Sequence, residues 1–336
     1  MTNTSIRVVL ITSSCLVFHA SAATDSSSTI TPLFGYQDDG LSAPVPEKTT
    51  VKPAENHTIL PFLGDEARKR GYELPAPFGV NINYMNIRQN INVDSINFNG
   101  LSLGGRSLDN AFKISVGNTR ERSKTETLKL DAWLLPFMNV YGLIGYTDGH
   151  SVSQIGVGIK GPLKDRTPSS LQNLAFQLDF KGTTYGVGTT LVGGVGNWFT
   201  AFDANYTQTR FDILDGSIDA LTLSPRIGYR FTTPSVDALH LPSGKLNLWV
   251  GSMYQDVQQE FSGNLNDLTM PSETLQRLVD IANKDGNGRF DVKQHLQSPW
   301  NVLVGAQYEI TRNFNVTTEI GFAERNSFFM AGEYRF

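Results

Sequence analysis

The sequence predicts an all-β fold, a transmembrane antiparallel β-barrel with up-and-down strand order. The first indication is a series of short segments whose side chains alternate between apolar and polar, separated by turns rich in Gly, Asn, Asp and Pro. The second is that no run of about 18 apolar residues occurs, so a helical membrane span is excluded. The third is that charged side chains stand in the middle of the polar faces, where a wet lumen would accommodate them.

The segment 218–231 illustrates the alternation. One face carries Thr222, Arg226 and Arg230, and the opposite face is apolar and aromatic. The apolar face consists of Leu221, Leu223, Ile227, Tyr229 and Phe231. Because successive residues of a strand point to opposite sides of the sheet, each set lies on one side.

Segments of this kind follow one another along the chain and predict about twelve strands. They span residues 112–122, 128–135, 140–146, 152–159, 174–181, 186–194, 198–210, 218–231, 246–261, 302–310, 314–322 and 328–336. Turns at 147–150 and 311–313 would join neighbours as hairpins, and neighbours in sequence favour an up-and-down order. Residues 78–98 form one further segment. It is either a hairpin broken near 88–90, which makes fourteen strands, or a piece folded into the barrel mouth.

The first 22 residues have the pattern of a secretory signal peptide. Arg7 supplies the positive charge, Val8–Phe18 the apolar region and Ala20–Ala22 a small-residue cleavage site. The single cysteine, Cys15, lies inside this segment. A mature chain that begins after residue 22 therefore contains no disulfide.

Residues 23–77 are predicted to be a flexible N-terminal segment, and residues 78–336 the barrel. The first part of this segment is rich in Ser, Thr, Pro and charge and has no periodicity that would bury a core. A short helix is expected within 60–72, ended by the proline-containing run Leu74–Pro77.

Each strand is expected to present one face to lipid and the other to the lumen. The predicted lumen-lining charges are Asp131, Asp179, Asp203, Arg226, Arg230, Glu309 and Glu319. The opposite faces end in aromatic residues, as the two interfacial girdles of a membrane barrel require: Trp198, Tyr206, Tyr229, Phe231, Tyr254, Tyr308 and Tyr334. A soluble β-sandwich or a barrel with an internal cavity is the alternative.

The segment Phe328–Phe336 resembles the closing strand of Gram-negative outer-membrane β-barrel proteins of the porin-like kind. It has an aromatic at its end and apolar or small residues at alternate positions before it. The resemblance implies a location in the bacterial outer membrane, with lipid around the barrel and both termini in the periplasm. It also implies an even strand number and places residues 262–298 outside the cell as an extracellular loop.

This loop contains a helical segment, Ser272–Ala282, followed by a run that resembles the calcium loop of an EF-hand. The candidate ligands are Asn283, Asp285, Asn287, Arg289 through its carbonyl, and Asp291. The run departs from that pattern at its first position, where Asn replaces Asp, and at its twelfth, where Gln294 replaces Glu. Only weak calcium binding is expected, and no other cofactor. The alternative is a turn whose side chains cap backbone groups.

Composition and histidine positions argue against two function classes. A net charge of -4 and a pI near 5.8 do not suit a nucleic-acid partner, which requires a basic surface. His57, His150, His240 and His295 all fall in predicted loops or turns, away from a strand-borne serine. The chain is therefore not expected to be an enzyme.

The sequence thus favours a narrow channel or transporter for small polar solutes. One alternative is a surface-interaction protein whose extracellular loop binds a partner or calcium. An outer-membrane hydrolase is a third hypothesis, and it would depend on a particular His or Ser. Glu309 and Glu319 would suit an acid/base couple, but facing inward on adjacent strands they are expected to line the pore or to pair with arginines. The solute and the oligomeric state are left open.

Overall fold

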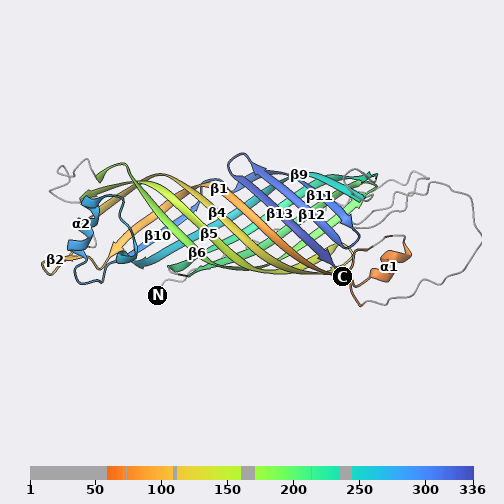
Figure 1. Ribbon diagram of the computed structural model, residues 1–336, viewed down its shortest axis with the longest axis horizontal. Coiled ribbons are helices and arrows are strands. Elements are labelled where there is room, and N and C mark those ends of the chain that lie inside the picture. Colours follow the sequence, from red (N-terminus) through yellow and green to blue (C-terminus); the bar gives the residue numbers. More distant parts are fainter. Residues whose placement is uncertain are drawn as a thin grey trace, which may run out of the picture.

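The computed structural model describes residues 59–70, 72, 74–108, 112–159, 171–212, 214–234 and 244–336. Within these residues one antiparallel sheet closes on itself, because β1 pairs with β13 on one side and β4 on the other (Figure 1). The ring consists of β1 (Phe78–Asn99), β4 (Phe112–Leu135), β5 (Met138–Ile159), β6 (Leu174–Val195), β7 (Trp198–Phe211), β8 (Asp215–Thr233), β9 (Gly244–Asn264), β11 (Trp300–Thr311), β12 (Phe314–Phe322) and β13 (Asn326–Arg335). The described part contains no helix that is long and apolar enough to span a membrane.

One additional strand, β10 (Arg289–Leu296), makes the number of strands in the ring differ between the two ends of the barrel. Strand β1 pairs with β13 through Gly79–Arg88 and then with β10 through Ile91–Asn99. Strand β9 likewise pairs with β11 and then with β10. Strands β11, β12 and β13 lie toward the end that carries α1 (Gly64–Lys69), and β10 lies toward the end that carries α2 (Glu273–Ala282) (Figure 1). In the described residues the barrel therefore has ten strands at the α1 end and eight at the α2 end.

The prediction of about twelve strands, or fourteen, was wrong. Three pairs of predicted strands are each one long strand, namely β4, β5 and β6. The expected turn at 147–150 lies inside β5, where Thr147 pairs with Thr125 and Gly149 with Ser123. Residues 78–98 form neither a hairpin nor a mouth segment, because they belong to β1 in the wall.

The remaining short elements lie at the two ends. Hairpin β2 (Ser102–Leu103) with β3 (Arg106–Ser107) and the 3-10 turn η4 (Leu265–Asp267) accompany α2, which lies where the sequence predicts a helix. The α2 helix begins after Ser272, whose hydroxyl accepts a hydrogen bond from Leu275 N at 3.2 Å.

Part of the predicted flexible segment, 23–77, is held against the barrel at the α1 end. Phe62 N donates to Leu134 O at 2.8 Å, and Trp133 N donates to Pro77 O at 2.8 Å. The signal peptide prediction for residues 1–22 lies outside the described residues, as does the segment up to residue 58.

The outer surface of the α1-end half is an apolar belt. Strand β12 crosses it in nine residues, close to the 9–11 that a tilted strand needs to span a bilayer. Its exposed side chains include Ile82, Leu128, Leu130, Ile144, Val187, Leu191, Phe202, Leu221, Ile227, Leu248, Val250, Val302, Val304, Ile320, Phe328 and Met330. An apolar surface of this extent on every strand of the ring is suited to hydrocarbon, not to water.

Aromatic side chains mark both edges of the belt. At the α1-end edge the exposed residues include Phe78, Phe137, Trp198, Phe231, Phe314, Tyr334 and Phe336. At the other edge Tyr146 and Tyr206 direct their hydroxyls away from the belt, donating to Asp212 and Asp219 at 2.7 Å. An apolar ring with a hydrated polar tip is the arrangement that membrane–water interfaces favour.

Beyond the belt, toward α2, the outer surface becomes charged. Lys181 Nζ lies 3.1 Å from Asp148 Oδ2, and Lys293 Nζ lies 2.8 Å from Glu260 Oε1. The hydrogen bond and charge of Glu260 raise the pKa of Lys293. Exposed ion pairs between neighbouring strands indicate that this half of the wall faces water.

Inside the α2-end half, the polarity is reversed and the barrel holds an apolar plug. Its buried members are Leu101, Val157, Leu171, Leu178, Phe180, Phe261, Leu265, Met270, Leu275, Val279, Ala282, Phe290 and Val292. The ring of Phe261 stacks on Phe211, with centroids 4.8 Å apart, and lies 5.6 Å from Phe180. The barrel therefore has a polar interior inside the membrane belt and a packed apolar core beyond it.

The belt predicts opposite effects for the same substitution at two positions of β9. Val250 lies among Ile227 and Val304 on the belt, and Gln258 lies on the same face beyond it. We expect Val250→Arg to lower the free energy of unfolding by about 2–4 kcal/mol, the range for arginine near a bilayer midplane. Urea unfolding in lipid vesicles, followed by tryptophan fluorescence, measures this. Gln258→Arg is the matched control and should change stability little; equal effects would contradict the belt.

Candidate functional site

The lumen contains a cavity of about 420 Å³, here called the chamber. Its wall comes from β1, β4 to β9 and β11 to β13, mostly at the level of the belt. The charged side chains on the wall comprise five acidic residues and three basic residues. These are Glu121, Asp131, Asp203, Glu319 and Glu333, and Lys129, Arg226 and Arg335. The described wall thus has a surplus of negative charge.

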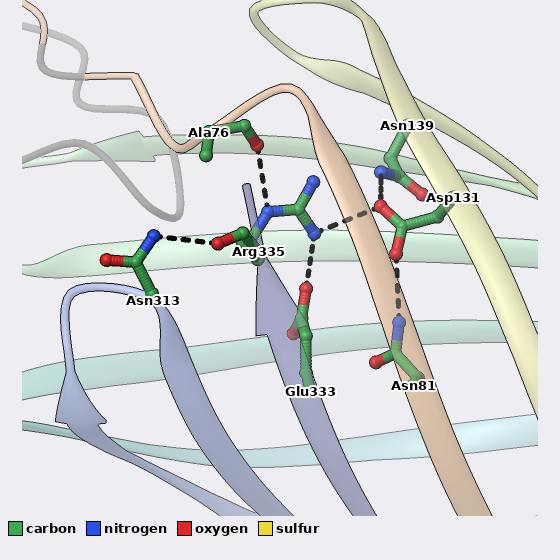
Figure 2. Close-up of polar contacts among 7 residues, drawn as sticks. All are labelled: Ala76, Asn81, Asp131, Asn139, Asn313, Glu333 and Arg335. Atoms are coloured by element: carbon green, nitrogen blue, oxygen red, sulfur yellow. Dashed lines mark hydrogen bonds and ion pairs between the residues drawn. The ribbon is translucent and has the colours of Figure 1, made fainter.

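Arg335 and Asp131 form the charged centre of the α1 end (Figure 2). Arg335 Nη1 donates to Asp131 Oδ1 at 3.0 Å and also to Glu333, and Arg335 Nε donates to Ala76 O at 3.0 Å. Asp131 accepts two further hydrogen bonds, from Asn81 Nδ2 at 2.9 Å and from Asn139 Nδ2 at 2.6 Å. This cluster joins β1, β4, β5 and β13, so it fastens the strands that close the ring.

A second ion pair lies within the chamber. Arg226 Nε and Nη2 donate to the two carboxylate oxygens of Glu319 at 2.7 and 3.0 Å, and Trp249 Nε1 also donates to Glu319 at 2.7 Å. This bidentate geometry is the strongest that an arginine and a carboxylate can form. The indole of Trp249 lies over Gly305, where an added Cβ would come within 2.3 Å of the ring. Only glycine fits at position 305 with Trp249 in this position.

Asp203 lies on the same wall and is bound by neutral donors. Its carboxylate accepts hydrogen bonds from the Tyr141 hydroxyl at 2.9 Å, from Thr190 Oγ1 at 2.7 Å and from Asn205 Nδ2 at 2.8 Å. Lys129 Nζ lies 4.6 Å from the centroid of the Tyr141 ring. Asp203 is therefore positioned by hydrogen bonds from uncharged polar side chains.

Four side chains form a polar partition at the α2 end of the chamber. Glu121 accepts hydrogen bonds from Gln89 Nε2 at 2.9 Å and from Gln259 Nε2 at 2.7 Å, and Gln294 donates to Gln259. They come from four neighbouring strands of the wall, β9, β10, β1 and β4, and the hydrogen bond between Gln259 and Glu121 links the two end members of this run, β9 and β4. Glu121 was not among the residues predicted to line the lumen. The one feature of the sequence that indicates its position is the alternation of the strand: Arg120 and Arg122 point outward, so Glu121 between them points inward.

The predicted lumen charges lie in three different places. Asp131, Asp203, Arg226 and Glu319 are on the chamber wall. Arg230 points inward nearer the α1 end, donating to Asn247 Oδ1 at 3.1 Å, and Glu309 acts electrostatically on it.

Asp179 lies on the outer surface of β6, and the prediction that it lines the lumen was wrong. Its neighbours Leu178 and Phe180 point inward and are buried in the apolar plug. Because the alternation is strict, Asp179 must then point outward into water. The prediction assumed that polar side chains face the lumen along the whole strand, which holds only inside the belt.

The EF-hand-like run forms a turn that leads into β10. Asn283 Oδ1 accepts from Gly288 N at 2.6 Å, and Asn283 Nδ2 donates to Asn266 Oδ1 at 2.8 Å. Asp285 accepts from Ser102, and the Arg289 side chain pairs with Asp215. These contacts of Asn283 are those expected from the alternative to a calcium loop, a turn whose side chains bind its own backbone and neighbouring side chains.

Asp291 belongs to β10, and Gly286 adopts a positive φ of 70° at the bend. No group of three or more His, Cys, Asp or Glu residues suited to a metal occurs in the described part of the chain. Calcium binding by the run that includes Asn287 stays a prediction.

A buried arginine lies where β12 turns into β13. Arg325 is 3% exposed; it donates to Gln255, and its Nη2 lies 3.4 Å from Pro299 O. Burial lowers the pKa of Arg325 to about 10, so the guanidinium stays charged at neutral pH. Arg325 thereby connects neighbouring parts of the wall at the point where the pairing partner of β9 changes from β11 to β10.

No protein-family model matches the chain, and no curated protein matches it. Among solved structures, it is similar to the β-domain of the Bordetella autotransporter BrkA (TM-score 0.37, 10% identity, 78% of this chain and 100% of that one). It is also similar to the outer membrane protein OprG from Pseudomonas aeruginosa (0.32, 12%, 78% and 98%). A third similar structure is an outer membrane channel from Pseudomonas putida F1 (0.22, 8%, 78% and 97%).

The location of the protein follows from its own surface and topology. A closed ring leaves no unpaired sheet edge, and closed barrels and helices are the structures that satisfy every backbone group in lipid. The apolar belt with aromatic edges surrounds the ring that Phe78 and Phe336 close through reciprocal backbone hydrogen bonds. The protein is a β-barrel that spans a membrane.

Proposed function

We propose that the protein is a narrow, gated passage for small, positively charged polar solutes, and that the structure described corresponds to its closed state. The observation that carries the proposal is the chamber inside the belt, a polar cavity of about 420 Å³ at the depth where solute must cross. A barrel that served only as a mount would need no such cavity.

The charge on the chamber wall supports a preference for cations. Five carboxylates face three basic side chains, and two of the carboxylates, Asp131 and Glu333, share the single cation Arg335. A wall of one prevailing sign in a low-dielectric surround concentrates ions of the opposite sign. A ten-stranded ring is also narrower than the sixteen-stranded porins, so only small solutes would pass.

The apolar plug supports the assignment of a closed state, with α2 as part of the gate. Leu275, Val279 and Ala282 of α2 are buried in the plug, so the helix closes the lumen at the end that we place outside the cell. Strands β9 and β10 are paired up to Asn264 and Arg289, so residues 265–288 leave and re-enter the wall at adjacent positions. The insert can therefore be replaced by a two-residue Asn-Gly hairpin turn without removing a wall strand.

Conductance in planar lipid bilayers tests the proposal. We expect the wild-type chain to conduct rarely and the hairpin variant to conduct several-fold more. The reversal potential in a potassium chloride gradient should show a preference for cations. Leu278→Ser with Ile281→Ser is the matched control, because both side chains lie on the exposed face of α2 and their replacement leaves the plug intact. Silence of every variant, or a preference for chloride, would refute the passage.

A surface-interaction protein is the second candidate. The α2-end half extends beyond the belt with a charged exterior, and Leu278 and Ile281 are exposed at its tip. The hairpin variant separates the two candidates. If it lost binding to a cell-surface partner while conductance stayed at the wild-type level, the barrel would be a mount. A change in conductance supports the gate.

A further inference from the structure

Glu121 is buried at the α2 end of the chamber without a cationic partner. Its side chain is 3% exposed and receives hydrogen bonds only from neutral amides, those of Gln89 and Gln259. Among the described residues, no lysine or arginine forms an ion pair or a hydrogen bond with it. An ionised carboxylate removed from water is strongly destabilising unless a positive charge compensates for it.

A second oxygen beside Glu121 has no partner at all. Gln89 is 8% exposed, and its Oε1 atom accepts no hydrogen bond, although its Nε2 atom donates to Glu121. Buried amide oxygens are normally satisfied, so an orphaned one beside an unpaired carboxylate calls for a missing donor or cation. Carboxylate and amide oxygens are the groups that hard cations and ammonium groups bind.

The two residues can be reached from the chamber. Both lie on its wall. The next inward side chain of β1 toward α2, Ile91, is instead buried in an apolar cluster with Val257 and Leu296. A cation would therefore arrive along the acidic wall that includes Asp203, and it would stop at the partition. The site lies where a solute would be held before the plug opens.

We infer that Glu121 and Gln89 form a cation-binding site that holds a monovalent metal ion or the ammonium group of a solute at the closed end of the chamber. The part of this inference that concerns a solute rests on the proposed passage. The binding site itself can be tested without any measurement of transport. A proton on Glu121 is the competing explanation. Its O–H would donate to Gln89 Oε1 after a half-turn of the amide, and no cation would bind.

Binding to the full-length chain in lipid vesicles at pH 7 tests the inference. N-methyl-D-glucamine chloride is replaced by potassium chloride or by methylammonium chloride at equal ionic strength. We expect a saturable rise of the urea unfolding midpoint and a change in the carboxyl bands of the infrared difference spectrum. A response to potassium identifies a metal-ion site, and a response to methylammonium alone identifies a site for a solute ammonium group. Either outcome supports the inference.

Three variants assign the response to the site. Glu121→Gln should abolish it while still folding, because the new amide can donate to the orphaned Gln89 Oε1. Gln89→Met should weaken the apparent affinity several-fold, because it removes only the amide oxygen. Glu126→Gln, on the exposed outer face of the same strand, should respond like the wild type.

No response of the wild type to either cation, or an equal response in Glu121→Gln, would overturn the inference in favour of a protonated structural carboxyl. Conductance measured on the same variants is a separate observation. A silent bilayer leaves the binding result standing, and an absent site leaves the passage standing.

Discussion

Replacement of Arg335 by alanine is expected to lower the free energy of unfolding by about 3–5 kcal/mol, the usual effect of removing one partner of a buried ion pair. Arg335 is 4% exposed and contacts Asp131 and Glu333, two carboxylates that would be left with no cation between them. The hydrogen bond to Ala76 O would be lost as well. Urea unfolding in lipid vesicles, followed by tryptophan fluorescence, measures the loss.

The variant that distinguishes charge from packing is Arg335→Gln combined with Asp131→Asn and Glu333→Gln. It keeps polar side chains of similar size but leaves no ion uncompensated, so it should recover most of the stability. If the neutral triple variant were as unstable as Arg335→Ala, the loss would come from packing near Trp133, whose ring centroid lies 5.7 Å from the guanidinium carbon. An unchanged stability of Arg335→Ala would contradict the role of this cluster in fastening the ring.

Replacement of Phe261 by alanine is also expected to destabilise the barrel by about 3–5 kcal/mol, the range for removing a buried phenylalanine. Phe261 is fully buried and packs against Phe211 and Phe180 at the centre of the apolar plug. The plug is held between strands, so it cannot collapse to fill the space that the ring leaves. The same unfolding measurement applies.

The control for this prediction is Ile281→Ala on α2. Ile281 is 59% exposed, so its replacement should change stability by no more than about 0.5 kcal/mol. A loss below about 1 kcal/mol for Phe261→Ala would mean that the α2-end half is loosely packed and would argue against a sealed lumen. The two substitutions together thus measure how tightly the gate is closed.

Several features could be predicted from the sequence because they depend on local order. Period-two alternation identifies which side chains share a face, so the apolar and polar faces predicted for 218–231 are the two faces of β8 in the structure. The helical pattern of Ser272–Ala282 likewise predicted α2. Asp131, Asp203, Arg226 and Glu319 were placed in the lumen because strands inside the belt have lipid on one side only.

The tertiary structure decided what alternation leaves open, namely which face is the inside. That choice depends on the medium outside, and the medium changes from lipid to water partway along β4, β5 and β6. On β6 the inner face changes from polar to apolar at this point, so this one long strand has the pattern of two strands joined by a turn, and Asp179 was assigned to the wrong side.

Partners across the ring depended on closure alone. Arg335 meets Asp131 from 204 positions away, and Gln259 meets Glu121 from 138 positions away. The sequence by itself determined a membrane barrel with a polar interior. The closure of the ring decided three further features: the strand number, the entry of β10 into the wall and the uncompensated carboxylate of Glu121. Pairing and burial across a lumen depend on three-dimensional proximity, which local periodicity does not encode.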